Sequence, residues 1–540
     1  MRWAEAPYER HQLNLISPSI DEMIGADHEI RLFEALLQRL DWGSWEERYN
    51  GRRGQPPIHP RLVAGSMLWG LLRGIRSSRH LEDATRHRTD FIWFLSGRTI
   101  DHSTFANFRN EFEVPLRGLS AELRKQAQAA LGGKLATVAV DGTLIRANSD
   151  WRGSKTADAL SRMLEQLGIE IDDLLAEMRD ADATAEENER LKRRLAAMEA
   201  QQAKLKRALS TARKRDKRKG KKSRKTRIPV TDPDATLRKN KEGGHAPNHA
   251  PVAAVDVDSG VIVHAEVLHE KSEAKSLSDV VDSCENELGK APEKVVADGN
   301  FACGKTFKSL DERGVETYVP IQDFNGAELA ERPDPSIGLS EARLQQLPLR
   351  NERFSRAAFL YDGDSDCVYC PAGQTMTLYR TLSNSGRNPD LVKKEYRTKA
   401  CLTCPLAARC VNKGCKQRTI SQDELAHLRE ASARRLRTDA GKALYRTRAP
   451  AIEGVFATVK HAMGIRRFLT RGHQKVETEW LWICTAFNLR KLLKKLAENP
   501  PFSAVAPIIN PLRAVFALIA PRTHRTAGKP TFGLLCHNLR

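Results

Sequence analysis

Residues 134–148 read KLATVAVDGTLIRAN. The run from Leu135 to Val140 consists mainly of β-branched and small apolar residues, which predicts a short buried strand. Asp141 and Gly142 follow that run directly. Because the end of a strand holds a side chain rigidly, Asp141 is a candidate metal-binding carboxylate at the edge of a sheet.

Two further acids occur in comparable settings. Residues 293–302 read EKVVADGNFA, so Asp298 also ends an apolar run and precedes a glycine. Glu453 lies in APAIEGVFATVKHAMGIRRF (449–468), where apolar residues at helical spacing predict a basic amphipathic helix. Three converging carboxylates can hold two divalent cations about 4 Å apart, which suits in-line attack on a phosphodiester. The alternative is that both Asp-Gly pairs are ordinary turns.

The overall charge points to a polyanionic partner. The 540 residues contain 88 Lys and Arg against 68 Asp and Glu, a formal charge of +20. Neutralising phosphates releases counterions, so DNA is the expected partner, and charge that serves only solubility is the alternative. The chain shows no apolar run of the ~20 residues that a membrane span needs. We therefore expect a cytoplasmic, nucleoid-associated protein without membrane contact.

The pattern of elements predicts an α/β fold with a mixed sheet. Residues 1–130 show apolar residues at helical spacing and predict an N-terminal helical DNA-binding domain, with Pro57 and Pro60 before one helix and Asp101 or Ser103 as a later cap. Residues 252–268 predict a hairpin that turns at 258–260. A helix near 275–288 and strands at 294–297 and 317–321 follow. Arginines expected on the DNA-facing side of the helical domain are Arg73, Arg76, Arg79, Arg86, Arg88 and Arg109.

A helical and basic insertion is expected at about 150–245. Leu191, Leu195, Met198, Leu205 and Leu209 recur at alternating spacings of four and three, which predicts either an intramolecular helical hairpin or a coiled-coil interface between subunits. The run ARKRDKRKGKKSRKTR (212–227) follows. Since its like charges repel and it has few apolar groups to bury, we expect it to be disordered until phosphates neutralise it, or to be a solvated segment without a specific role.

A cysteine-rich insertion is expected at about 323–440. Cys367, Cys370, Cys401 and Cys404 form two Cys-x-x-Cys pairs that can supply four thiolates to a structural zinc ion. Cys410 and Cys415 leave the choice of ligands open, and reduced or redox-active cysteines are the alternative. Without histidines at ligand spacing, a catalytic zinc is not expected.

Several stretches together resemble bacterial insertion-sequence transposases of the DDE type. They are DHSTFANFRNEF, VAVDGTLIRAN, TDPDATLRKNK, VVADGNF followed by GVETYVP, and YRTRAPAIEGVFATVKHAMGIRRFLTRG, and the likeness spans roughly residues 10–497. The resemblance implies an RNase H-like catalytic domain in which Asp141, Asp298 and Glu453 bind Mg²⁺ or Mn²⁺. It also matches Tyr445, Arg448 and Lys460 to the family's signature around the glutamate.

The expected function is DNA cleavage and strand transfer of an insertion sequence by two-metal chemistry. Basic residues near Glu453 are expected to hold DNA phosphates: Arg448, Lys460, Arg466, Arg467 and Arg471. The alternatives are a metal-dependent endonuclease without strand transfer and a catalytically decayed DNA-binding protein. The catalytic domain is expected at 131–497 and a partly ordered tail at 498–540. Holding two DNA ends implies a homodimer or higher oligomer on DNA.

Overall fold

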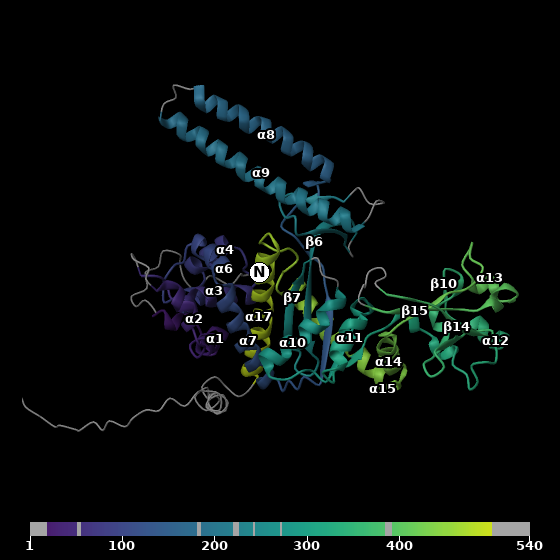
Figure 1. The fold of residues 1–540 in the computed structure, drawn as a ribbon. Coiled ribbons are helices and arrows are strands. Elements are labelled where there is room, and N and C mark those ends of the chain that lie inside the picture. The colour runs from purple at the N-terminus through teal and green to yellow at the C-terminus, as the bar shows by residue number, and fades with distance from the viewer. Residues whose placement is uncertain are drawn as a thin grey trace, which may run out of the picture.

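The computed structural model describes residues 19–50, 56–180, 185–219, 226–240, 243–269, 273–383 and 391–498. Figure 1 shows a central sheet with the N-terminal helices on one side, a lobe containing β10 to β16 on the other, and a long helical hairpin projecting away from both. The tail expected at 498–540 lies outside the described residues apart from residue 498. In the part of the chain that is described, no helix is both long and apolar enough to cross a membrane.

The N-terminal region is helical, as the sequence predicts. Its helices begin at the expected signals, because Pro60 opens one helix and the Asp101 side chain accepts a hydrogen bond from the Ser103 backbone N–H. Trp45 stacks on Phe108 and Phe112 within this core. The elements are η1 (Asp21–Met23), α1 (Glu29–Leu37), α2 (Gly43–Glu46), η2 (Glu47–Tyr49), α3 (Pro60–Leu72), α4 (Ser78–His87), α5 (Thr89–Phe94), α6 (His102–Glu111) and α7 (Glu113–Ala130).

The central sheet is mixed, which confirms the α/β class. Its main path runs β2-β6-β1-β8-β9, and β5 and β7 also pair with β6. β1 is antiparallel to β6 but parallel to β8, and β9 is parallel to β8. The strands are β1 (Thr137–Gly142), β2 (Ile145–Arg146), β5 (Thr236–Lys239), β6 (His245–Asp256), β7 (Ile262–Leu268), β8 (Lys294–Ala297) and β9 (Glu316–Tyr318). The hairpin predicted at 252–268 is therefore confirmed as β6 and β7.

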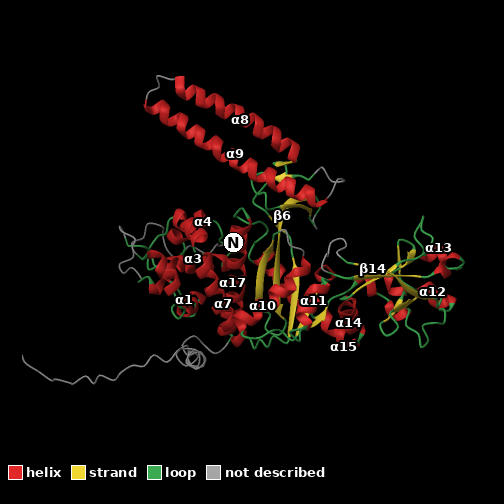
Figure 2. Ribbon diagram, viewed as in Figure 1, coloured by secondary structure: helices red, strands yellow, loops and turns green. Residues whose placement is uncertain are grey.

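Both faces of the sheet are covered by helices (Figure 2). Successive residues of β6 point to opposite faces, so Val252 and Ala254 join one apolar cluster while Ala253 and Val255 join the other. The first cluster packs on α10 (Ser276–Leu288) and α11 (Gly304–Asp311). The second packs on helices from late in the chain, α16 (Arg448–Ala457), the π-helical turn η9 (Thr458–Ala462) and α17 (His473–Ala497).

The segment between β2 and β5 forms a helical hairpin of α8 (Ala157–Asp180) and α9 (Ala185–Lys219), whose base carries β3 (Ser154–Lys155) and β4 (Ile228–Pro229). The predicted leucine stripe packs on α8: Leu205 and Leu209 are buried against Leu160, Leu167 and Ile171. The stripe thus packs against a helix of the same chain, which favours the intramolecular hairpin over the intersubunit coiled coil.

The basic run after this stripe is partly helical, so the expectation of complete disorder is wrong. Residues 212–219 continue α9, and residues 220–225 lie outside the described part. Ala212 is buried in the hairpin core, and Arg215 donates to the carbonyl oxygens of Asp234 and Ala235. These contacts offset the mutual repulsion of the basic side chains.

The cysteine-rich lobe is built on a second sheet with strand order β12-β13-β14-β15-β16. Its strands are β10 (Leu349–Arg350), β11 (Arg353–Phe354), β12 (Leu360–Asp362), β13 (Cys367–Tyr369), β14 (Thr375–Leu382), β15 (Lys393–Arg397) and β16 (Ile420–Asp423). Its helices are η5 (Gln322–Phe324), η6 (Ala327–Leu329), α12 (Glu341–Gln346), η7 (Arg356–Ala358), η8 (Lys399–Leu402) and α13 (Ala407–Cys410). From it the chain returns to the central sheet through α14 (Ala426–Arg437) and α15 (Asp439–Arg446).

Candidate active site and DNA-facing surface

Asp141 and Asp298 lie at the same edge of the central sheet. β1 and β8 are parallel, with Val140 opposite Ala297, so the residues that follow these two leave neighbouring strands side by side. Asp298 caps η4 (Gly299–Phe301) by accepting a hydrogen bond from the Asn300 backbone N–H over 2.8 Å. The two acids are close enough that the charge of Asp298 raises the pKa of Asp141.

Arg448 partly neutralises this pair. Its Nη1 donates to Asp141 Oδ2 over 2.8 Å, and the neighbouring oxygen of Asp141 accepts from the Gly142 backbone N–H. Burial raises the pKa of Asp141, whereas the contacts with Arg448 and Gly142 lower that pKa. The effect of burial is the larger one, so the pKa lies above its usual value. The site thus makes the ionised carboxylate costly unless a cation is close.

Glu273 is a further acid at this site, and no local pattern in the sequence predicts it. It opens η3 (Glu273–Lys275), which packs beside η4. Burial raises the pKa of Glu273, and the carboxylates of Asp298 and Asp141 raise it further. Glu273 follows no apolar run and stands among charged residues, so only the folded chain brings it to the other acids.

Glu453 lies on the helix that crosses this edge, without a direct contact to either aspartate. The helix is held at two points, since Arg448 bonds Asp141 and Lys460 Nζ donates to Thr143 Oγ1 over 2.6 Å. Glu453 is exposed, and it lies two turns before Lys460 on the same side of the helix. The predicted apolar stripe of this helix is confirmed, because Ile452, Val455, Phe456, Val459 and Met463 are buried.

The three predicted acids do not form a closed coordination group. Among the described residues, the acids and histidines whose ligand atoms all lie within 4.8 Å of one another are Glu82, Asp101 and His102, in the N-terminal helices. The structure therefore brings Asp141, Asp298 and Glu273 into one electrostatic neighbourhood and leaves Glu453 on the helix beside it. An all-carboxylate donor set of this kind still fits hard divalent cations such as Mg²⁺.

Two family models match the chain. Residues 369–493 match the model described as "Transposase DDE domain", and residues 18–111 match "Transposase domain (DUF772)". Together these two matches support an insertion-sequence transposase of the DDE type. No curated protein and no solved structure matches it. The first match includes Glu453 and the lobe from Tyr369 onward, whereas Asp141 and Asp298 lie outside both matches.

The matched DDE domain indicates the broad chemistry. A DDE domain is the DNA-cleaving part of such proteins, and the family normally uses a divalent metal. DNA is accordingly the substrate class that the family implies.

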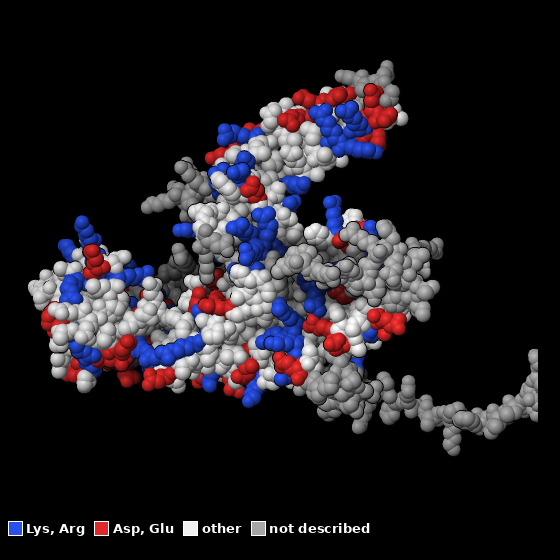
Figure 3. Space-filling view, turned by 180° about the vertical axis from the view of Figure 1, so that it is seen from behind, with Lys and Arg blue, Asp and Glu red and all other residues white. Residues whose placement is uncertain are grey.

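Arg467 and Arg471 line a large open cavity of the transposase together with Arg146, Asn148 and Trp151. The loop that carries both arginines runs along β2, because Phe468 N–H donates to the Arg146 carbonyl and Arg471 Nε donates to the Asn148 carbonyl. Arg466 is exposed and contacts His461 instead. Figure 3 shows Lys and Arg side chains gathered below the base of the helical hairpin.

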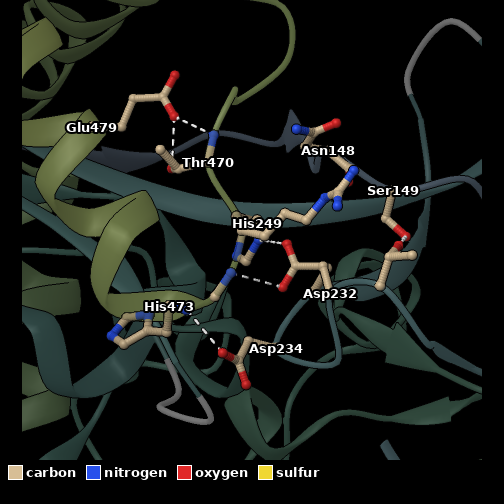
Figure 4. Close-up of polar contacts among 12 residues, drawn as sticks. Asn148, Ser149, Asp232, Asp234, His249, Thr470, His473 and Glu479 are labelled. Atoms are coloured by element: carbon tan, nitrogen blue, oxygen red, sulfur yellow. Dashed lines mark hydrogen bonds and ion pairs between the residues drawn. The ribbon is translucent and has the colours of Figure 1, made fainter. Parts of the chain in front are cut away.

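Glu479 fixes the shape of this loop. It is buried and accepts hydrogen bonds from the backbone N–H groups of Leu469 and Thr470 and from the Thr470 hydroxyl (Figure 4). It also accepts from Arg76 Nη2, which donates to the Arg467 carbonyl as well. The loop is thereby tied to the N-terminal helices.

Several arginines expected on the DNA-facing side of those helices are engaged inside the transposase. Besides its contacts with the loop, Arg76 has a carbonyl that accepts from Arg109 Nη2. Arg73 pairs with Glu29, and Arg88 pairs with Asp90. Helix packing brings Glu29 to Arg73, whereas Asp90 is a local partner two residues after Arg88. Arg79 remains exposed.

A buried acid joins three segments at the base of the helical hairpin. The Oδ2 atom of Asp232 lies 2.9 Å from Nε2 of His249 on β6, and its other oxygen accepts from the Gly472 backbone N–H (Figure 4). Nearby, Asp234 accepts from the His473 backbone N–H and from Arg207 on α9. Burial opposes ionisation, but the bond to His249 and the neighbouring donors hold the pKa of Asp232 below its usual value.

Of the four cysteines predicted to bind zinc, the structure groups three. Cys370, Cys401 and Cys404 line one cavity of the lobe, and the fourth cysteine there is Cys410. Cys367 does not line it and lies buried on β13. Along an extended strand, residues three positions apart point to opposite faces. Cys367 and Cys370 would therefore need a tight turn between them to bind one ion, but β13 is extended from Cys367 to Tyr369.

Proposed function

We propose that the chain cleaves DNA at the ends of an insertion sequence and transfers the freed strand to target DNA. The observation that carries this is the placement of Asp141 and Asp298 at the ends of adjacent parallel strands, with the helix of Glu453 held across that edge. Separate turns at the two Asp-Gly pairs would not require neighbouring strands.

The sheet supports an RNase H-like catalytic domain. β6 pairs antiparallel with both β1 and β7, and β8 and β9 then add in parallel on the other side of β1. We take this core to span 131–497, interrupted by the helical hairpin near 150–245 and by the cysteine-rich lobe near 323–440. Residues 1–130 would be the DNA-binding helical domain.

Asp141, Asp298 and Glu453 would hold the Mg²⁺ or Mn²⁺, and Glu273 is placed to contribute. When bound, a pair of such ions activates the attacking oxygen and stabilises the leaving oxygen. Lys460 is fixed by Thr143 beside Gly142 and would orient a phosphate next to the acids. Arg448 would exchange Asp141 for a DNA phosphate as substrate enters.

The open cavity lined by Arg146, Arg467 and Arg471 would receive the DNA strand. Guanidinium groups bind phosphates in a bidentate manner, and Trp151, with 49% of its surface exposed, offers a ring for a base to stack on. Strand transfer between two element ends further implies a homodimer or higher oligomer on DNA.

The test is cleavage and joining by the purified protein. We expect nicking of plasmid DNA that carries the element ends in Mg²⁺ or Mn²⁺, and joining of a labelled 3′ end to a second DNA. Asp141→Ala and Asp298→Asn should abolish both reactions. Asp258→Asn, an exposed acid in the β6–β7 turn, is the matched control and should retain them.

The other outcomes separate the alternatives. Nicking without joining would identify a metal-dependent endonuclease. DNA binding without nicking would identify a decayed DNA-binding protein, and activity in both aspartate variants would refute the proposed site.

A further inference from the structure

The cysteine-rich lobe contains a cavity lined by four cysteines from three segments of the chain. Cys370 follows β13, Cys401 lies in η8, Cys404 follows η8, and Cys410 ends α13. Among the residues that the structure describes, no carboxylate or histidine lines this cavity.

The turn after Cys370 is built to hold a sulfur atom. The backbone N–H groups of Gln374 and Ala372 both point at the Cys370 sulfur, and Gly373 N–H donates to the Cys370 carbonyl over 2.9 Å. Gly373 has φ +77°, and a Cβ there would lie 2.3 Å from the Ser336 carbonyl oxygen. Amides aimed at a sulfur stabilise the thiolate form that binds metals.

Two partly buried arginines flank the same cysteines. Arg332 donates to the Cys370 carbonyl and Arg418 donates to the Cys410 carbonyl. The Nε atom of each is buried without a hydrogen-bond partner. A negative centre at the cysteines would offset the cost of holding these two partly buried cations, and four neutral thiols do not provide one.

We propose that Cys370, Cys401, Cys404 and Cys410 together bind one structural zinc ion. Four thiolates around Zn²⁺ carry a net charge of −2, which the guanidinium groups of Arg332 and Arg418 balance. Thiolates are soft ligands that favour zinc over Mg²⁺, and four protein ligands close the tetrahedron, so no position is left for catalysis.

This ligand set differs from the two Cys-x-x-Cys pairs that the sequence offers. Cys367 is excluded because it lies on β13 away from the cavity, and Cys415 is exposed beyond α13. Among the described residues no three of these sulfur atoms lie within 4.8 Å of one another. The proposal therefore requires the cysteine side chains to rotate toward one another when zinc binds. Closure would tie the β13 turn to η8 and α13.

The experiment is metal analysis of the full-length protein. We expect about one zinc per chain after purification, and replacement by Co²⁺ should give the intense sulfur-to-metal charge-transfer band of tetrahedral thiolate sites. Cys410→Ser should lower zinc content and affinity at least tenfold, whereas Cys367→Ser and Cys415→Ser should retain both.

Three results would overturn the proposal: wild-type protein that takes up neither zinc nor Co²⁺, zinc loss in Cys367→Ser, or full zinc retention in Cys410→Ser. If Cys410→Ser does not fold, the proposal is still tested by the Co²⁺ spectrum of the wild type and by the zinc content of Cys367→Ser. Because the readout is metal content, it is independent of DNA cleavage.

Discussion

Arg448 Nη1 donates to Asp141 Oδ2 over 2.8 Å, so the first residue of α16 holds an acid at the end of β1 that lies 307 positions earlier. The side chains are largely buried, with 16% and 21% of their surfaces exposed. A cation that binds Asp141 has to compete with this arginine.

We therefore expect Arg448→Ala to bind Mg²⁺ more tightly, by about fivefold, which corresponds to about 1 kcal/mol for a partly buried pair. Isothermal titration calorimetry without DNA measures the affinity. Arg446→Ala removes an exposed arginine of the preceding helix and should leave the affinity unchanged. Weaker binding in Arg448→Ala would mean that the arginine positions Asp141 instead of competing for it.

Glu273→Gln should stabilise the protein near neutral pH in the absence of divalent cations. Burial and the two aspartates raise the pKa of Glu273 in the folded state, so its ionised form costs stability above that pKa, and the cost disappears as the pH falls through it. The gain should be no more than about 1 kcal/mol, because solvent screens a half-exposed group.

Thermal unfolding at several pH values measures this effect. The gain of Glu273→Gln should shrink toward acidic pH, and the variant should show a smaller Mg²⁺-induced rise in melting temperature than the wild type. Glu165→Gln, an exposed glutamate on α8, is the control. A destabilised Glu273→Gln protein would contradict the proposed clustering of charge.

Asp232→Asn should destabilise the protein by roughly 3–5 kcal/mol, since it breaks a fully buried pair with His249 and weakens the bond to Gly472. The pKa of Asp232 is held below its usual value, so its contribution is present above about pH 4 and is lost as the pH falls through the folded value. Urea unfolding should show that the free energies of unfolding of the wild type and the variant converge at acidic pH. Asp172→Asn on the exposed side of α8 should behave like the wild type.

Glu479→Gln should weaken DNA binding, although it removes a negative charge. The carboxylate accepts hydrogen bonds from backbone N–H groups of the loop that carries Arg467 and Arg471, and it pairs with the partly buried Arg76. Glutamine cannot accept all these donors, so the loop should lose its shape. Fluorescence anisotropy with labelled DNA measures the change, and Glu498→Gln is the control of equal charge. Tighter binding by Glu479→Gln would show that charge outweighs loop geometry.

Trp151→Ala should weaken binding of single-stranded DNA by about 1–3 kcal/mol, the typical value of one base-stacking contact. The folded protein should be little affected, because the ring is about half exposed. Tyr379→Ala removes an exposed aromatic ring from the cysteine-rich lobe and should bind as the wild type does. Equal affinity of both variants would remove Trp151 from the DNA path.

Local patterns in the sequence were enough to predict most helices and strands and to single out two of the acids. Asp141 and Asp298 stand out because each ends an apolar run, and a strand end is a local property. The stripe of Ile452, Val455 and Phe456 predicts its helix for the same reason. Glu273 has no such context, and the pairing of Arg76 with Glu479 joins residues 403 positions apart, so neither was visible before folding.

The sequence by itself determined the α/β class, the leucine stripe and the resemblance to transposases, because these rest on periodicity and on short motifs. Only the tertiary structure decided which side chains meet. It turned the leucine stripe inward onto α8, placed Arg448 on Asp141, and grouped Cys410 with Cys370, Cys401 and Cys404 while leaving Cys367 aside. The physical reason is that contacts between distant segments depend on how strands pair and helices pack, and spacing along the chain does not encode those distances.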